Sequence, residues 1–335
     1  MSTTGRSLLE RAPLGGPQLG ILDTNTIFND LIYQLRHRRE EGAMIASARA
    51  GAVGLLASSH VYGEVYRRAP SQERRGFSTG QILGLFERRY LPHIRFVDVA
   101  GLPLGVRATA VLEADPDDLP TAQLALTLAP CHVYTDDPDL TDAGFGQQRN
   151  WLGLIHSSDR AMKVDQSALL LAELVRWGWR KAAPWTERRL REIGPMEVLL
   201  GGAIGLLVLS ALPASGLARL ERTIEAGERC IAGAGELGAG AGLGLLGERA
   251  RQTGYLAQSL VPADPVPRIE ARLARELAVR GPLGLVDLSR AAAATREEAE
   301  PILARLPCFV SEASGWQLGR HLPARPRRQV SSSAR

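Results

Sequence analysis

The stretch GILDTNTIF, residues 20–28, places an aspartate between a short apolar run and the start of a helix. The apolar run, residues 19–22, is too short to bury itself alone and predicts an inner strand of a parallel sheet. Asp23 falls at the carboxyl end of this strand, where open α/β sheets bind their ligands. Thr24, Asn25 and Thr26 offer side-chain oxygens that suit the cap of the following helix. A single carboxylate is a weak signal, so its meaning depends on whether others reach the same edge.

Composition indicates a globular protein with a basic character. The chain has 335 residues, 45% of them hydrophobic, and a formal net charge of +4, which is enough chain for two or three domains. Arginines cluster at 36–39, 67–68, 74–75 and 88–89. Any single pair is most simply a solvated basic face, but four clusters within ninety residues favour a polyanionic partner. The three cysteines have neither metal-ligand spacing nor a disulfide pattern, which fits a reducing compartment. The N-terminus lacks the apolar region of a secretory signal, so we expect a cytoplasmic protein.

Strand-like and helix-like segments alternate through residues 19–160. We expect strands at 19–22, 52–57, 94–99 and 131–135, with 152–156 as a candidate last strand. Helical patterns lie between them, at 26–40, after 58, at 78–90 and at 121–129. This alternation predicts an α/β fold with a parallel sheet flanked by helices.

Four acidic residues fall at strand ends or at the helix starts beside them: Asp23, Glu64, Asp118 and Asp137. Because the carboxyl ends of parallel strands share one edge, these side chains are expected to converge. Converging carboxylates repel one another unless cations neutralise them, and hard oxygen ligands suit Mg²⁺ or Mn²⁺. Such a site activates water and stabilises the charge that develops on a phosphodiester.

These motifs resemble the PIN domain family of metal-dependent nucleases. The matching residues, in order over about 19–156, are LDTN at 22–25, Glu64 in its helix, DPDD at 115–118 followed by apolar helix positions, and TDDPDL at 135–140. The resemblance implies a small parallel α/β sheet that cuts single-stranded RNA. It also implies metal ligation and catalysis by Asp23, Glu64, Asp118 and Asp137, with Asn25, Asp115, Thr135 and Asp139 as auxiliary residues. Asp115 is the alternative to Asp118 as third ligand, and Asp136 the alternative to Asp137.

A simpler interpretation exists for each acidic element taken alone. The run 113–118 is also typical of a solvated turn, and Asp118 also suits a plain helix cap. The order and spacing of all four elements together favour the metal site.

The middle segment, 161–260, is expected to be helical and contains an uncharged apolar stretch at 198–218. Its basic, Trp-rich flank and a second Gly- and Ala-rich stretch that ends at 247 suggest a membrane hairpin attached to the cytoplasmic side. The strongly apolar part spans only about 15 residues, which is also typical of a buried core helix.

Residues 261–320 resemble a winged helix-turn-helix domain. A Pro-rich linker at 261–267 precedes helical patterns at 268–280, 285–293 and 296–306, and a hairpin pattern follows at 308–318. Thr295 and Glu298 form a predicted capping box. The third helix is acidic, so packing or protein interaction is as well supported as DNA binding. We expect residues 1–18 and the basic tail, 321–335, to be disordered.

The sequence therefore predicts a metal-dependent nuclease, an endoribonuclease above all, with Mg²⁺ or Mn²⁺ as cofactor and single-stranded RNA as partner. A toxin or defence role follows only by analogy at the level of the fold. Membrane association, a homodimer and a regulatory protein partner are further hypotheses. The competing function is a non-catalytic regulator that binds DNA or a partner through its C-terminal domain.

Overall fold

A computed structural model describes residues 18–39, 41–146, 150–166, 248–264 and 267–319. The predicted lead-in, 1–18, lies outside these ranges except for Gln18, which begins the first strand. The apolar hairpin at 198–247 and the basic tail, 321–335, also lie outside them, as does most of the helical segment 161–260. Within the ranges described, none of the helices combines the length and the apolar character that a membrane crossing needs.

A five-stranded sheet organises residues 18–146, with strand order β3-β2-β1-β4-β5. The strands β1 (Gln18–Leu22), β2 (Val53–Ser58), β3 (Ile94–Val97) and β4 (Cys131–Tyr134) run parallel to their neighbours. The short β5 (Leu260–Val261) is antiparallel to β4. The predicted α/β class with a mostly parallel sheet is therefore confirmed.

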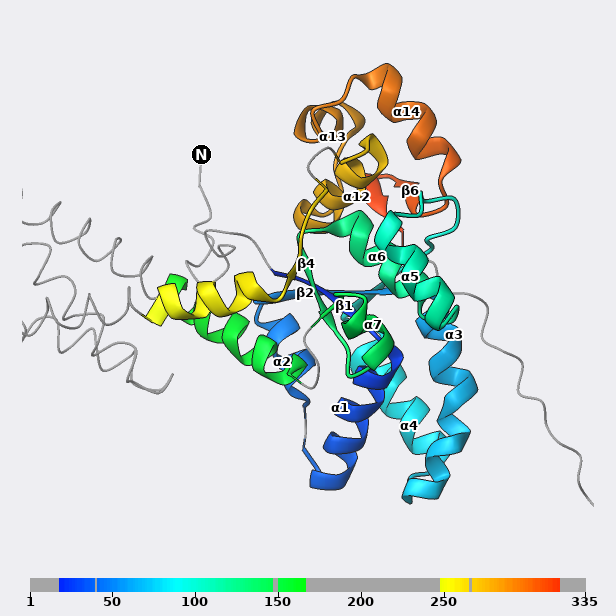
Figure 1. Cartoon of the computed structure of the whole chain (residues 1–335), viewed down its shortest axis with the longest axis vertical. Helices are drawn as coiled ribbons and strands as arrows, with labels where there is room; N and C mark the ends of the chain where they lie inside the picture. Colours follow the sequence, from blue (N-terminus) through cyan, green and yellow to red (C-terminus); the bar gives the residue numbers. More distant parts are fainter. Residues whose placement is uncertain (1–17, 40, 147–149, 167–247, 265–266, 320–335) are drawn as a thin grey trace, which may run out of the picture. The chain divides into compact units, whose positions relative to one another are not determined.

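Helices cover both faces of this sheet (Figure 1). On one side lie α1 (Thr24–His37), α2 (Ala43–Arg49) and α4 (Thr79–Leu85), the last extended by the π-helical turn η3 (Phe86–Tyr90). On the other side lie α5 (Val106–Ala114) and α6 (Leu119–Leu128). The remaining helices of this part are α3 (Ser59–Arg68), the 3₁₀ turn η2 (Ala69–Arg75) and α7 (Pro138–Asp142). Strand residues alternate between the two faces, so Leu19 and Ile21 both enter the core beneath α6.

The C-terminal elements share that same core. They are α12 (Ile269–Arg280), α13 (Leu285–Ala291), α14 (Arg296–Arg305) and the hairpin of β6 (Phe309–Glu312) with β7 (Gly315–Leu318). Their order is the predicted one, and Thr295 and Glu298 form the predicted capping box. Apolar side chains of α12, α13 and α14 belong to one hydrophobic cluster with those of α6 and β1. The C-terminal helices are therefore packed against the α/β sheet and are not a module joined only by a linker.

Two arginines connect α12 to the α/β part through backbone carbonyls. Arg275 Nη1 donates to the carbonyl oxygen of Leu128, the last residue of α6, at 2.6 Å and to that of Pro130, just beyond the helix, at 2.8 Å. Arg95 Nη1, on β3, donates to the carbonyl oxygen of Leu277 in the last turn of α12 at 3.1 Å. Both cations meet carbonyls near helix C-termini, where positive charge is favoured.

The predicted last strand at 152–156 is wrong. Residues 151–166 are helical, and the position beside β4 is taken by β5, which comes from more than a hundred residues later in the chain. A run of a few apolar residues fits a buried strand and a buried helix equally, so its periodicity did not distinguish the two.

Candidate functional site

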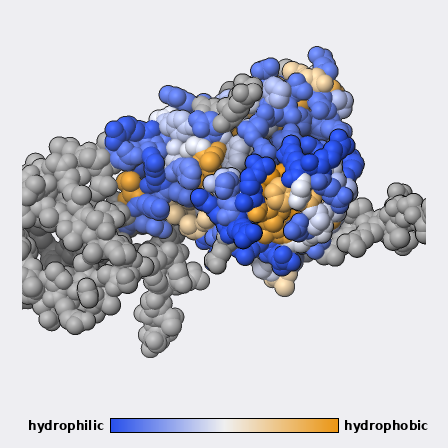
Figure 2. Space-filling model, turned by 90° about the horizontal axis from the view of Figure 1, so that it is seen from below, coloured by the Kyte–Doolittle hydropathy of each residue, from blue (hydrophilic) through white to orange (hydrophobic). Residues whose placement is uncertain are grey.

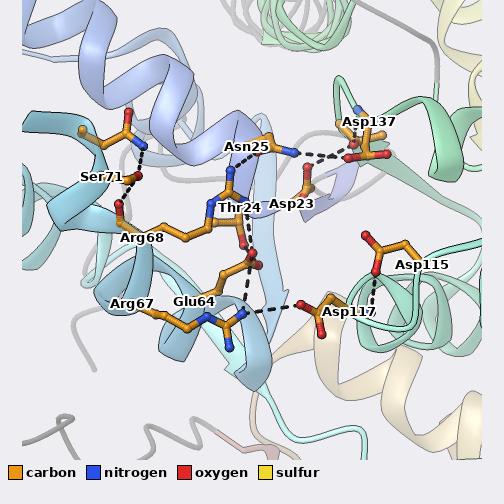
Figure 3. A network of polar contacts seen from close by, with 12 residues as sticks. Asp23, Thr24, Asn25, Glu64, Arg67, Arg68, Ser71, Asp115, Asp117 and Asp137 are labelled. Carbon is orange, nitrogen blue, oxygen red and sulfur yellow. Dashed lines mark hydrogen bonds and ion pairs between the residues drawn. The ribbon is translucent and has the colours of Figure 1, made fainter. Parts of the chain in front are cut away.

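The predicted acidic residues lie at the carboxyl edge of β1, β2 and β4, which are neighbours in the sheet (Figure 3). Asp23 follows β1, Glu64 is in α3 directly after β2, and Asp137 lies shortly after β4. Asp118 immediately precedes α6, which crosses the same sheet. This edge is where parallel α/β sheets place their ligands.

Asp23 is the most buried carboxylate of the site, with only 3% of the residue exposed. Thr135 Oγ1 donates to its Oδ2 at 3.1 Å. Burial raises the pKa of Asp23 from the ordinary 3.8 to about 6, the Thr135 hydrogen bond opposes this rise, and the charges of Asp137 and Glu64 add to it. A cation placed beside Asp23 would remove the cost of its ionisation.

Asp137 is held by the two auxiliary residues that the motif comparison implied. Asn25 Nδ2 donates to Asp137 Oδ2 at 3.3 Å, and the Asp137 amide donates to Thr135 Oγ1 at 2.9 Å. Asp137 Oδ1 accepts from the Asp139 amide at 3.0 Å and so caps the start of α7. Asn25 and Thr135 thus orient the acidic edge, and Asp139 contributes through its backbone.

Asp118 has the most perturbed carboxylate of the site. Burial, followed by the charges of Asp23, Asp137, Asp115 and Glu64, raises the pKa of Asp118 to about 8. Its Oδ2 is buried and has no hydrogen-bond partner among the described residues. Asp115 stabilises the preceding turn, because its Oδ1 accepts from the Asp117 amide at 2.9 Å. Of the two alternatives, Asp118 is therefore the one whose carboxylate needs a positive partner.

Glu64 lies in a different setting, since arginines and a hydroxyl already contact it. Thr24 Oγ1 donates to Glu64 Oε2 at 2.6 Å, and Arg68 Nη1 donates to Glu64 Oε1 at 3.0 Å. Arg68 also donates to Asn25 Oδ1 at 2.7 Å. The more exposed Arg67 lies 3.9 Å from Glu64 and 3.7 Å from Asp117, so it links α3 to the turn before α6.

These arginines and Thr24 are site residues that the motif reasoning missed. Arg67 and Arg68 follow Glu64 at spacings of three and four, which place side chains on one face of a helix, so the signal was present. Thr24, Asn25 and Thr26 were expected to cap α1. They connect α1 to other elements instead, with Thr26 Oγ1 donating to the Tyr134 carbonyl at 2.8 Å.

Asp136 lies outside this network. Its Oδ2 accepts from Asn29 Nδ2 at 2.8 Å and from Trp151 Nε1 at 3.2 Å. Asp137, which Asn25 contacts, is therefore the aspartate of this pair that belongs to the acidic edge.

The carboxylates at this edge are the type of ligand that a hard divalent cation binds, but their side chains are not close enough together to form a complete ligand set. Across the part of the chain that the structure describes, no three His, Cys, Asp or Glu side chains are grouped closely enough to form a metal site. The donors at the edge are all carboxylate oxygens, which Mg²⁺ and Mn²⁺ prefer. The buried Oδ2 of Asp118 has no hydrogen-bond partner among the described residues and its pKa is raised, and a nearby positive charge would relieve both features.

Comparison with known proteins gives no independent identification. No family model, no curated protein and no solved structure matches the chain.

Proposed function

We propose that the chain is a divalent-metal-dependent nuclease that hydrolyses phosphodiester bonds of single-stranded RNA. The observation that carries this proposal is Asp118, a partly buried carboxylate with an unpartnered oxygen and a pKa raised by its acidic neighbours. A bound cation would compensate this oxygen, since an unpartnered buried carboxylate oxygen is costly.

Asp23, Asp118 and Asp137 would hold the cation, with Glu64 as the fourth carboxylate. The bound metal would supply an activated water and neutralise charge on the phosphodiester. Thr135 and Asn25 keep the carboxylates of Asp23 and Asp137 oriented through their hydrogen bonds. Arg68 donates to both Glu64 and Asn25, so it would compete with the cation for the Glu64 carboxylate.

A polyanionic substrate is supported by the exposed arginines beyond the acidic edge. Arg67 at the edge has 59% of its side chain exposed, and the pairs at 74–75 and 88–89 are also exposed. The face seen from below in Figure 2 is largely hydrophilic, with a larger apolar area and some smaller ones. Exposed guanidinium groups bind phosphates with little desolvation cost.

The competing proposal of a DNA-binding regulator has less support. In winged helix-turn-helix readers the third helix contacts DNA, but α14 carries Glu297 and Glu298 in its first turn. Its Arg296 lies 3.5 Å from Glu300 in an ion pair. This helix therefore presents negative or neutralised charge and is poorly suited to a phosphate backbone.

The test uses the full chain with single-stranded RNA and single-stranded DNA, in Mg²⁺, in Mn²⁺ and in chelator. Asp118→Asn and Asp137→Asn are compared with Asp136→Asn, a neighbouring aspartate outside the acidic network. We expect metal-dependent cleavage of RNA that falls at least about 100-fold in the first two variants and little in the third. Equal activity in all the variants, or cleavage that persists in chelator, would refute the proposal.

A further inference from the structure

A hollow of about 580 Å³ lies beside the acidic edge and is not used by the proposed metal chemistry. Three segments line it: the start of α3, the loop after β3 and the start of α6. The residues on which the inference depends are His60, Ala100, Leu104, Leu119, Pro120 and Gln123. Its volume is within the range of sites that bind small molecules or parts of larger ligands.

Two separate elements connect this hollow to the carboxylates. Leu119 and Pro120 follow Asp118 directly, so their Cα atoms are within about 4–8 Å of the Asp118 Cα. His60 and Glu64 are four residues apart in α3, so their side chains lie on one helix face about 6 Å apart along its axis. The hollow is therefore next to the site where a phosphodiester would be cut.

The lining suits an uncharged, flat group rather than a phosphate. The acidic Asp98 lines the hollow and none of the described Lys or Arg residues does, which disfavours a phosphate there. Leu104, Leu119 and Pro120 provide apolar surface. Leu104 is 54% exposed, so its side chain is accessible to a ligand in the hollow. Polar groups are also present, since His60 and Gln123 line the same space.

His60 contributes an aromatic ring to the lining of the hollow. Flat aromatic side chains are surfaces on which unpaired bases stack, and single-stranded RNA is read through stacked and splayed bases. The ring of His60 therefore suits a base more than it suits a phosphate.

We propose that this hollow receives a nucleobase of the nucleotide next to the scissile phosphate. This inference rests on the proposed nuclease function and names the part of the substrate that the neighbouring surface recognises. The arrangement divides recognition between an apolar hollow for the base and carboxylates with a cation for the phosphate. It requires an unpaired base, so it selects single strands over duplexes.

The test has two parts: protein variants that fill the hollow, and oligoribonucleotides that lack one base. Ala100, exposed in the lining, is changed to Trp, and Ala110, exposed on α5 outside the lining, is changed to Trp as the matched control. Affinity is measured by fluorescence anisotropy with Ca²⁺ in place of Mg²⁺, using oligoribonucleotides with one abasic residue moved along the sequence. Leu104→Ala, at an exposed position, is the second variant in case Ala100→Trp fails to fold.

We expect Ala100→Trp to weaken binding of the intact oligonucleotide about tenfold and Ala110→Trp to leave it unchanged. One abasic position should weaken binding to the wild-type protein about tenfold and have no effect on Ala100→Trp. The inference is overturned if every abasic position binds the wild type equally, or if Ala100→Trp and Leu104→Ala both behave like Ala110→Trp. The nuclease proposal is tested separately by the cleavage assay, and it fails if the wild-type chain shows no metal-dependent cleavage.

Discussion

Asp23→Asn is expected to stabilise the metal-free protein at neutral pH, although Asp23 is central to the proposed site. Burial is the main cause that raises the pKa of Asp23 from 3.8 to about 6. A carboxyl group whose pKa is raised on folding destabilises the folded state once pH exceeds the pKa of the unfolded state. This loss of folding free energy is complete when pH exceeds the pKa of the folded state. The gap is roughly two pH units at about 1.4 kcal/mol each, so ionising Asp23 costs about 3 kcal/mol at pH 7.

Asparagine removes this cost and keeps most of the local geometry. Its side-chain oxygen still accepts the hydrogen bond that Thr135 donates to Asp23 Oδ2 at 3.1 Å. Its amide group needs a new partner, which costs about 1 kcal/mol. We therefore expect the free energy of unfolding to rise by about 2 kcal/mol at pH 7. Once the ionisation cost has disappeared, between about pH 6 and about pH 4, the variant should be about 1 kcal/mol less stable than the wild type.

The assay is urea unfolding followed by circular dichroism, in chelator at pH 7 and pH 4.5 and then in excess Mg²⁺ at pH 7. Mg²⁺ should stabilise the wild type more than the variant, because binding to the folded state adds to its stability. Asp136→Asn is the control, since its carboxylate already has two hydrogen-bond donors. If Asp23→Asn is less stable than the wild type in chelator at pH 7, the assigned cost of the buried carboxylate is wrong.

Three further predictions concern the arginines and a buried histidine. Arg68→Ala should tighten Mg²⁺ binding several-fold by calorimetry, because it frees Glu64 from its nearest cation; unchanged affinity would exclude Glu64 from the metal site. Arg275→Met should lower the free energy of unfolding by about 2–3 kcal/mol in urea titrations, because the guanidinium loses its hydrogen bonds to two carbonyls. The control Arg290→Met removes an exposed ion pair and should change the free energy of unfolding little. Burial lowers the pKa of His132 from 6.5 to about 4, so the unfolded state takes up the proton at a higher pH than the folded state does. The free energy of unfolding should therefore fall by about 3 kcal/mol as pH drops from about 6.5 to about 4. Comparison with His132→Gln over this pH range isolates that contribution, and parallel pH profiles would contradict it.

The local pattern of the sequence determined the class and order of the main elements. The apolar run before Asp23 is β1, the alternation that follows is a mostly parallel α/β sheet, and Thr295 with Glu298 caps α14 as predicted. These features depend on residue periodicity and on neighbours within one turn, which are visible in any short window. The positions of the acidic residues at strand ends follow from the same pattern, because parallel strands share a carboxyl edge.

Only the tertiary structure decided which groups contact these carboxylates. Arg68 holds Glu64, Thr24 donates to Glu64 rather than capping its own helix, and Asp136 is bonded away from the acidic edge. The tertiary structure likewise placed α12 against α6 and supplied β5 from a distant segment. Apart from the Arg68–Glu64 pair, which lies within one helix, these contacts join residues separated by forty to more than a hundred positions. They depend on how packed layers meet and not on local preference.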